Sequence, residues 1–195
     1  MESRQQRVCL FGGIFDPVHL GHSHIAETAI RELELDLLIF LPCKQSPHKL
    51  EQQPTSGEDR LKMCQLATQN MATVSVDDFD LTAPEPNYSW RTAEYMQTRY
   101  LDARLFWLMG TDQWEALPRW NRYQYLGELV EFIVFTRGNN PEPRKGFRMH
   151  CIQGNHPASA TEVRKSILSG DFSTAQSWLH ENVLSHIHTQ QLYKK

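Results

Sequence analysis

The sequence lacks the features that would place the protein in a membrane or outside the cell. None of its apolar runs approaches the length of a membrane span, and no stretch near its start has the length of a signal-peptide core. The four cysteines are isolated, with no Cys-x-x-Cys pair, so they indicate reduced thiols and no zinc site. We therefore expect a cytoplasmic protein with no membrane partner.

The sequence also lacks an excess of positive charge. The 195 residues carry a formal net charge of −3 and show no basic stripe, which argues against a general nucleic-acid binder. Small anionic substrates remain possible because they need only local positive charge. The length suffices for one domain with a sizeable core, so residues 1–195 are expected to form a single domain. No pattern specifies an oligomeric state or a protein partner.

Two common phosphate-binding glycine patterns, G-x-G-x-x-G and G-x-x-x-x-G-K-[ST], are missing as well. In their place stands FGGIFDPVHLGHSH, from Phe11 to His24, which follows an apolar run and precedes a helical pattern. Gly12 and Gly13 allow a ligand to approach the main chain, and the start of the following helix offers free N–H groups to an anion. The expected ligand is a phosphate.

His19 and His22 lie three residues apart at the start of this predicted helix. Their imidazoles can point the same way, donate hydrogen bonds to one phosphate and stabilise charge that builds on it. Two alternatives stay open on the residues alone: a tight turn with two surface histidines, and a partial metal site. The metal alternative needs further ligands at suitable spacing, and the Gly-Gly and Phe-Asp-Pro residues have no use in it.

Apolar runs and helical patterns alternate along the rest of the chain. The predicted strands cover residues 8–11, 36–42, 73–76, 105–109, 131–137 and 150–153. The predicted helices cover about residues 25–33, 55–67, 89–100, 159–168 and 175–193. Thr55 and Ser159 are predicted to cap two of these helices, residues 77–87 to form an irregular loop, and the tail to pack on the sheet. The alternation predicts an α/β fold: a doubly wound parallel sheet with helices on both faces and a helical C-terminal tail.

Polar residues follow several predicted strands, at the end of an open α/β sheet where ligands bind. Lys44, His48 and Lys49 follow the second strand, and Gly110 and Asp112 follow the fourth. Phosphate contact is predicted for the first group and sugar contact for Asp112. The open alternatives are an ordinary solvated basic loop and a helix cap.

Two further groups are candidates for ligand contact. Thr161 and Arg164 share one face at the start of the helix predicted from Ser159, free to meet phosphate, although a capped helix without a ligand explains the same pattern. Trp120 belongs to an aromatic group with more rings than a short helix can bury, so at least one ring is predicted to stack on a ligand, with simple packing as the alternative.

The stretch GGIFDPVHLGH, residues 12–22, resembles the signature of the HxGH nucleotidyltransferase superfamily, which has a Rossmann-like fold and transfers a nucleotidyl group from a nucleoside triphosphate. Further motifs resemble those of the bacterial nicotinate-nucleotide adenylyltransferases, in the same order and over almost the whole chain. These motifs are PCKQSPHK, NYSWRTAEYM, MGTDQWEALPRWNRYQYL, SATEVRKSI and VLSHIHTQQLY.

The resemblance implies that ATP and nicotinate mononucleotide react by direct in-line attack to give nicotinate adenine dinucleotide and pyrophosphate, a step of NAD biosynthesis. It implies that Mg²⁺ arrives with ATP and that the protein has no metal site of its own. It assigns catalysis to His19, His22 and Arg164. Contacts to ATP are implied for Gly12, Gly13, Phe15, His19, His22, Gly110, Asp112, Ser159, Thr161 and Arg164. Contacts to the mononucleotide are implied for Lys44, His48, Lys49, Ser89, Trp120 and Asn121.

The chain departs from the family pattern in places. Asn87-Tyr88-Ser89 stands where the family has Ser-Tyr-Thr, Ala160 where it often has a second serine, and Cys43, Lys44 and Gln45 where it often has an amide or small residues. The loop Gly154 to Ala160 is expected to be mobile until it closes over the triphosphate.

Rival functions are another HxGH adenylyl- or cytidylyltransferase, with nicotinamide mononucleotide or phosphopantetheine as acceptor, and a non-catalytic nucleotide sensor. The sensor is disfavoured because both histidines, Lys49 and Arg164 are present.

Overall fold

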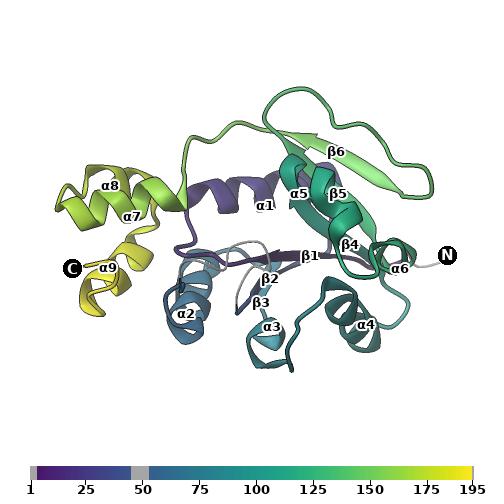
Figure 1. Cartoon of the computed structure of the whole chain (residues 1–195), viewed down its shortest axis with the longest axis horizontal. Helices are drawn as coiled ribbons and strands as arrows, with labels where there is room; N and C mark the ends of the chain where they lie inside the picture. Colours follow the sequence, from purple (N-terminus) through teal and green to yellow (C-terminus); the bar gives the residue numbers. More distant parts are fainter. Residues whose placement is uncertain (1–3, 45–52, 195) are drawn as a thin grey trace.

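The computed structural model describes residues 4–44 and 53–194, and it is built around one sheet of parallel strands (Figure 1). The sheet has six strands in the order β3-β2-β1-β4-β5-β6. Their bounds are β1 Arg7–Gly13, β2 Leu37–Pro42, β3 Val74–Val76, β4 Arg104–Gly110, β5 Glu131–Thr136 and β6 Met149–Gln153. Each predicted strand is therefore confirmed to within two residues at either end.

Helices connect the strands from β1 to β5 and complete the chain, whereas a loop without a helix, residues 137–148, connects β5 to β6. Their bounds are α1 Leu20–Glu32, α2 Gly57–Thr68, α3 Phe79–Thr82, α4 Ser89–Arg99, α5 Thr111–Ala116, α6 Tyr123–Leu129, α7 Ala160–Ser169, α8 Ser173–Trp178 and α9 Glu181–Thr189, with a 3₁₀ turn η1 at Leu117–Arg119. No helix in the described ranges is long and apolar enough to cross a bilayer.

Side chains of each central strand alternate between two hydrophobic cores, one on each face of the sheet. Cys9 and Phe11 of β1 belong to one core, and Val8 and Leu10 belong to the other. The first core includes side chains of α1, α2, α7, α8 and α9, and the second includes side chains of α4, α5 and α6. Burial on both faces explains why the strands are continuous apolar runs. The predicted doubly wound α/β fold is confirmed.

Two local predictions between β2 and α4 are wrong. Ser56, not Thr55, caps α2, because its Oγ accepts a hydrogen bond of 3.0 Å from the backbone N–H of Asp59. The segment predicted as an irregular loop contains the short helix α3, whose start is stabilised by a 2.9 Å hydrogen bond from the N–H of Phe79 to the Oδ1 of Asp77. A single helical turn is too short to leave a periodic pattern in the sequence.

The C-terminal tail also differs from the prediction. It forms two helices rather than one, because Leu179 and His180 are extended and the ring of His180 hydrogen-bonds the Ser23 hydroxyl of α1 at 2.7 Å. The helices α7, α8 and α9 gather at one end of the molecule, where α9 packs beside α2 and adds side chains to the first core (Figure 1). Leu168, near the end of α7, is an apolar residue that is 50% exposed.

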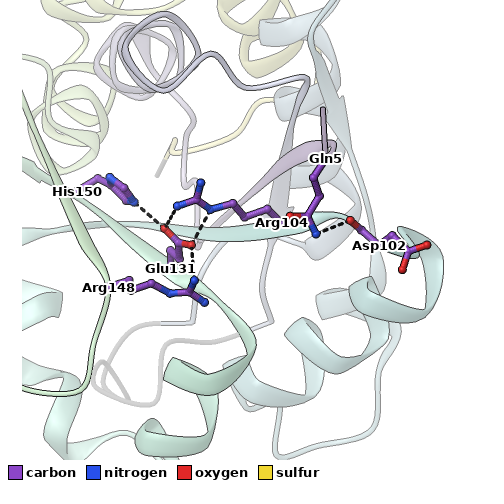
Figure 2. A network of polar contacts seen from close by, with 6 residues as sticks. All are labelled: Gln5, Asp102, Arg104, Glu131, Arg148 and His150. Atoms are coloured by element: carbon purple, nitrogen blue, oxygen red, sulfur yellow. Dashed lines mark hydrogen bonds and ion pairs between the residues drawn. The ribbon is translucent and has the colours of Figure 1, made fainter. Parts of the chain in front are cut away.

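The amino ends of β4, β5 and β6 carry an ion cluster (Figure 2). The carboxylate of Glu131, with its side chain only 1% exposed, accepts two 2.6 Å hydrogen bonds from Arg104 and contacts His150 at 2.7 Å and Arg148 at 3.1 Å. Burial alone would raise the pKa of Glu131, but these hydrogen bonds and positive charges outweigh burial and lower the pKa to about 2. This cluster lies at the end of the sheet formed by the amino ends of the strands, opposite their carboxyl ends.

Candidate active site

The segment that contains His19 and His22 follows β1. The strand order of the sheet reverses between β1 and its neighbour β4. Pairing between these strands runs from Arg7 with Arg104 to Leu10 with Trp107, although both strands continue for three more residues. Their carboxyl ends are therefore not hydrogen-bonded to each other. An opening of this kind at the point of reversal is where open α/β sheets bind ligands.

The loop after β1 presents the two histidines to this opening. His19 is the N-cap residue of α1, and its backbone N–H donates a 3.2 Å hydrogen bond to Nδ1 of His22. The two rings are stacked with centroids 3.8 Å apart, and the ring of Phe15 meets His22 edge-on at 5.0 Å. Phe15 has a positive φ of 53°, and a Cβ on Gly13 would come within 2.9 Å of its ring. Gly13 is therefore required for the packing that supports the histidine pair.

Both histidines are neutral at pH 7. Burial, followed by the charges of His156 and Arg137, lowers the pKa of His19 to about 4. Burial, followed by His19 and Arg137, lowers the pKa of His22 well below its ordinary value. Because Nδ1 of neutral His22 accepts the hydrogen bond from His19, the proton of the His22 ring lies on Nε2. His22 can therefore donate a hydrogen bond without carrying a charge.

Asp16 joins the candidate phosphate-binding residues of α7 to this loop. The Arg164 guanidinium donates a 2.5 Å hydrogen bond to the carbonyl oxygen of Asp16, whose carboxylate accepts one of 2.5 Å from the Tyr193 hydroxyl. At the start of α7, Ser159 is half-buried and Thr161 is exposed. Ser159 is the N-cap residue of α7, as predicted, although its side chain makes no capping hydrogen bond.

Gly110 and Asp112 lie where β4 gives way to α5. Gly110 is the N-cap residue of this helix, and Asp112 is an exposed residue of its first turn. A Cβ on Gly110 would come within 2.8 Å of the Asp112 carboxylate. Any other residue at position 110 would therefore displace this carboxylate. The alternative of an Asp112 side-chain cap is wrong, because α5 has no side-chain hydrogen bond at its N-cap.

The residues predicted for the mononucleotide come from three segments. Lys44 follows β2 and donates a 3.1 Å hydrogen bond to the carbonyl of Ala83, while Ser89 begins α4. Trp120 follows η1, meets Trp107 edge-on at 6.4 Å, and its buried Nε1 has no hydrogen-bond partner among the described residues. His48 and Lys49 lie outside the described residues.

Asn121 is tied to the start of α4. Its Oδ1 accepts a 3.0 Å hydrogen bond from Nε1 of Trp90, and the guanidinium groups of Arg91 and Arg122 lie over the Trp90 ring at 5.2 and 4.7 Å. The structure thus brings Ser89 and Asn121 into one neighbourhood through the half-buried Trp90.

Several residues near the histidines were given no role from the sequence. Arg137 directly follows β5 and lines a shallow pocket with Gly154 and Asn155, and its charge and that of His156 act on His19. Arg60, Asp16 and Tyr193 were missed because each acts through contacts distant in sequence. Nowhere in residues 4–44 and 53–194 do three or more His, Cys, Asp or Glu side chains form a group that could hold a metal ion.

Comparison with known proteins identifies the family. The sequence profile of the cytidylyltransferase-like family matches residues 10–166. The chain is 41% identical over 163 residues to a probable nicotinate-nucleotide adenylyltransferase of Methylacidiphilum infernorum, covering 83% of this chain and 80% of that protein. It is 33% identical over 193 residues to the corresponding protein of Endomicrobium trichonymphae, covering 96% and 99%.

Solved structures support the same fold. The nicotinic acid mononucleotide adenylyltransferase of Plasmodium falciparum, complexed with NaAD, matches with a TM-score of 0.81 over 97% of this chain and 98% of that one, at 17% identity. This likeness shows a Rossmann-like fold, while the sequence identities above show the family. The chain belongs to the nicotinate-nucleotide adenylyltransferase family of cytidylyltransferase-like enzymes.

Proposed function

We propose that the protein transfers the adenylyl group of ATP to nicotinate mononucleotide and releases pyrophosphate. The observation that carries this proposal is the neutral, stacked pair His19 and His22, held at the opening between β1 and β4 in a chain of this family. The solved structure of the Plasmodium falciparum relative contains NaAD, and nicotinate adenine dinucleotide is the product of the reaction proposed here.

The reaction is a direct displacement at the α-phosphorus of ATP. An oxygen of the mononucleotide 5′-phosphate forms a bond to that phosphorus while the bond to the β-phosphate oxygen breaks. The attacking phosphate already carries its charge, so no protein base or nucleophile is required, and catalysis depends on positioning and on stabilising charge in the transition state.

His19 and His22 hold the α-phosphate in this proposal. Nε2–H of His22 donates to a phosphate oxygen, and the backbone near Gly12 and Gly13 allows the phosphate to come close to the main chain. An anion bound here raises the pKa of both imidazoles, because an opposite charge favours their protonated form. The pair can therefore gain positive charge as negative charge develops on the substrate.

Arg164 holds the leaving pyrophosphate together with Ser159 and Thr161. One N–H of its guanidinium is used by the Asp16 carbonyl, which leaves the remaining donors of the fork for phosphate oxygens. Gly110 and Asp112 contact the adenosine ribose, and Phe15 supports the histidine pair. Trp120, Ser89 and Asn121 bind the pyridine end, and Lys44, His48 and Lys49 bind the mononucleotide phosphate and ribose.

Mg²⁺ arrives with ATP and neutralises phosphate charge when bound. Mg²⁺ keeps several waters when it binds through substrate phosphates, so it would need no dedicated cage of protein ligands.

A pyrophosphate-release assay tests the function. Purified protein with Mg-ATP is given nicotinate mononucleotide, nicotinamide mononucleotide or phosphopantetheine in turn, and CTP replaces ATP in a parallel series. We expect the highest kcat/KM with ATP and nicotinate mononucleotide. A preference for phosphopantetheine or CTP, or no release with any acceptor, would contradict the proposal.

A further inference from the structure

Arg60 is a buried arginine that the proposed mechanism leaves without a role. It lies in the first turn of α2, and only 2% of the residue is exposed. Within the described residues no carboxylate lies at ion-pair distance from its guanidinium. A buried charge without such a partner is costly, so its remaining contacts must compensate for lost hydration.

Those contacts are backbone carbonyls from separate segments. Nη1 donates to the carbonyl of Ile14 at 2.8 Å and to that of Cys43 at 2.6 Å, and Nη2 donates to Lys44 at 3.3 Å. Nε donates to the carbonyl of Thr55 at 2.8 Å. A guanidinium has five N–H donors spread over a rigid fork, whereas a lysine ammonium has three at a single nitrogen, so arginine suits carbonyls from separate segments better.

The three segments form two sides of the candidate site. Ile14 belongs to the loop that carries Phe15 and the histidine pair, and Lys44 belongs to the loop that carries the predicted mononucleotide contacts. Thr55 is linked to the first loop a second time, because its N–H donates a 3.4 Å hydrogen bond to the Asp16 carboxylate. Arg60 is thus the shared anchor of the ATP side and the acceptor side.

We propose that Arg60 is a positioning residue, which holds Cys43 and Lys44, directly after β2, against the loop after β1 so that the acceptor phosphate lines up with the α-phosphate of ATP. This proposal rests on the proposed function. Arg60 touches neither substrate. Its effect falls on alignment, because a displacement of about 1 Å in a reacting group can reduce turnover on the order of a hundredfold.

Arg60→Lys tests the proposal, with Arg104→Lys as the matched control. Both variants keep the charge and lose a guanidinium fork, but Arg104 lies in the Glu131 cluster at the opposite end of the sheet (Figure 2). The melting temperature of each variant is measured first. Kinetics are then measured at a temperature well below the melting temperatures of both variants. Both variants are expected to melt at lower temperature than the wild type.

Kinetics separate positioning from mere support of the fold. For Arg60→Lys we expect kcat/KM for nicotinate mononucleotide to fall about a hundredfold, shared between kcat and KM, with the KM for ATP changed less than about threefold. The KM for ATP changes less because β1 and α1 still hold the glycine loop. For Arg104→Lys all three constants should stay within about twofold of the wild type.

Constants for folded Arg60→Lys that match those of Arg104→Lys would overturn the positioning role. If Arg60→Lys does not fold, Arg60→Gln, which buries no charge and keeps two N–H donors, is measured in the same way and decided by the same criteria. Wild-type enzyme that fails to use nicotinate mononucleotide would instead overturn the proposed function, so the two failures are distinguishable.

Discussion

The hydroxyl of Tyr193 donates a 2.5 Å hydrogen bond to the Oδ1 of Asp16, which lies 177 residues earlier in the chain. The last ordered turn of the protein is thereby attached to the loop between β1 and α1. The other carboxylate oxygen of Asp16 accepts from the N–H of Thr55, and its carbonyl accepts from Arg164. One aspartate therefore joins the C-terminal tail, α7 and the start of α2 around the histidine pair.

Tyr193→Phe removes only the hydroxyl of this contact. A hydrogen bond to a charged acceptor contributes about 1.5 to 3 kcal/mol, so the free energy of unfolding should fall by an amount in this range. The KM for ATP should rise severalfold, because the loop that supports Arg164 loses one attachment. Urea unfolding and steady-state kinetics measure the two effects. Tyr95→Phe, on an exposed residue whose hydroxyl has no hydrogen bond within the described residues, should change neither.

His22→Ala should reduce kcat about a hundredfold or more and leave the fold intact. The loss of one preorganised donor to developing charge has an effect of this size in other enzymes. Circular dichroism checks that the fold is intact, and single-turnover kinetics measure the loss of rate. His188→Ala, which removes an exposed imidazole of α9, is the control and should keep full activity. A His22→Ala enzyme with near-normal turnover would refute the assignment.

Stability should fall as the pH drops from about 6.5 toward 4. In the unfolded chain His19 binds a proton below about 6.5, whereas in the folded protein its pKa is about 4, so the unfolded state holds more protons in this window. One such histidine changes the free energy of unfolding by about 1.4 kcal/mol per pH unit, or about 2 to 3 kcal/mol between pH 6.5 and 4.5. His22 and His156, with lowered pKa values, act in the same direction.

Urea midpoints between pH 4.5 and 7.5 measure this slope. His19→Asn cannot titrate, so its slope should be smaller than that of the wild type by about one proton. An unchanged slope would show that His19 does not remain neutral in the folded protein.

Glu131→Gln should destabilise the protein without affecting catalysis. Arg104, Arg148 and His150 would lose their shared carboxylate, and because Arg148 and His150 are partly solvated the loss should be about 1 to 3 kcal/mol, less than for a fully buried pair. The contribution of Glu131 also disappears as the pH falls from about 4.5 through its folded pKa of about 2. The free energy of unfolding, measured with urea, should therefore change less between pH 7 and pH 3 for the variant than for the wild type. Altered kcat or KM at pH 7 would contradict this separation.

The central strands could be predicted from the sequence because burial on both faces leaves a local mark. Leu37–Pro42 and Arg104–Gly110 are nearly uninterrupted apolar segments, and their short length and flanking turns favour a buried strand over a buried helix. The break between α8 and α9 could not be predicted in the same way. His180 is held by Ser23 on another helix, and no property of the residues next to it reports that contact.

The same distinction applies to the candidate site. His19 and His22 belong to one short motif whose spacing places both imidazoles at a helix start, so their stacking follows from local geometry. Arg60, by contrast, is an ordinary charged residue of an amphipathic helix in the sequence. Its function as an anchor depends on carbonyls of residues 14 and 43, which only the folded sheet brings together.

The choice of acceptor gives the last prediction. Nicotinate and nicotinamide mononucleotides differ only in a carboxylate against a carboxamide, so the pocket must offer donors and positive charge rather than acceptors to favour the acid. Arg91 and Arg122 lie over the Trp90 ring and form no ion pair within the described residues. The Oδ1 of Asn121 is already used by Trp90 as an acceptor. Ser89 begins α4, where the helix N-terminus adds a positive dipole end.

We therefore expect kcat/KM to favour the acid by roughly tenfold to a few hundredfold, since a buried mismatch of donors and acceptors costs about 1 to 3 kcal/mol. Parallel kinetics with the two mononucleotides measure the ratio.

Trp120→Ala should raise the KM for nicotinate mononucleotide far more than the KM for ATP, because the lost ring would stack on the pyridine alone. Trp178→Ala, in α8, removes a partly buried indole elsewhere and controls for general loss of packing. Equal use of both mononucleotides would refute the pocket while leaving the reaction class standing, and an equal effect of Trp120→Ala on both substrates would place Trp120 outside the pyridine site.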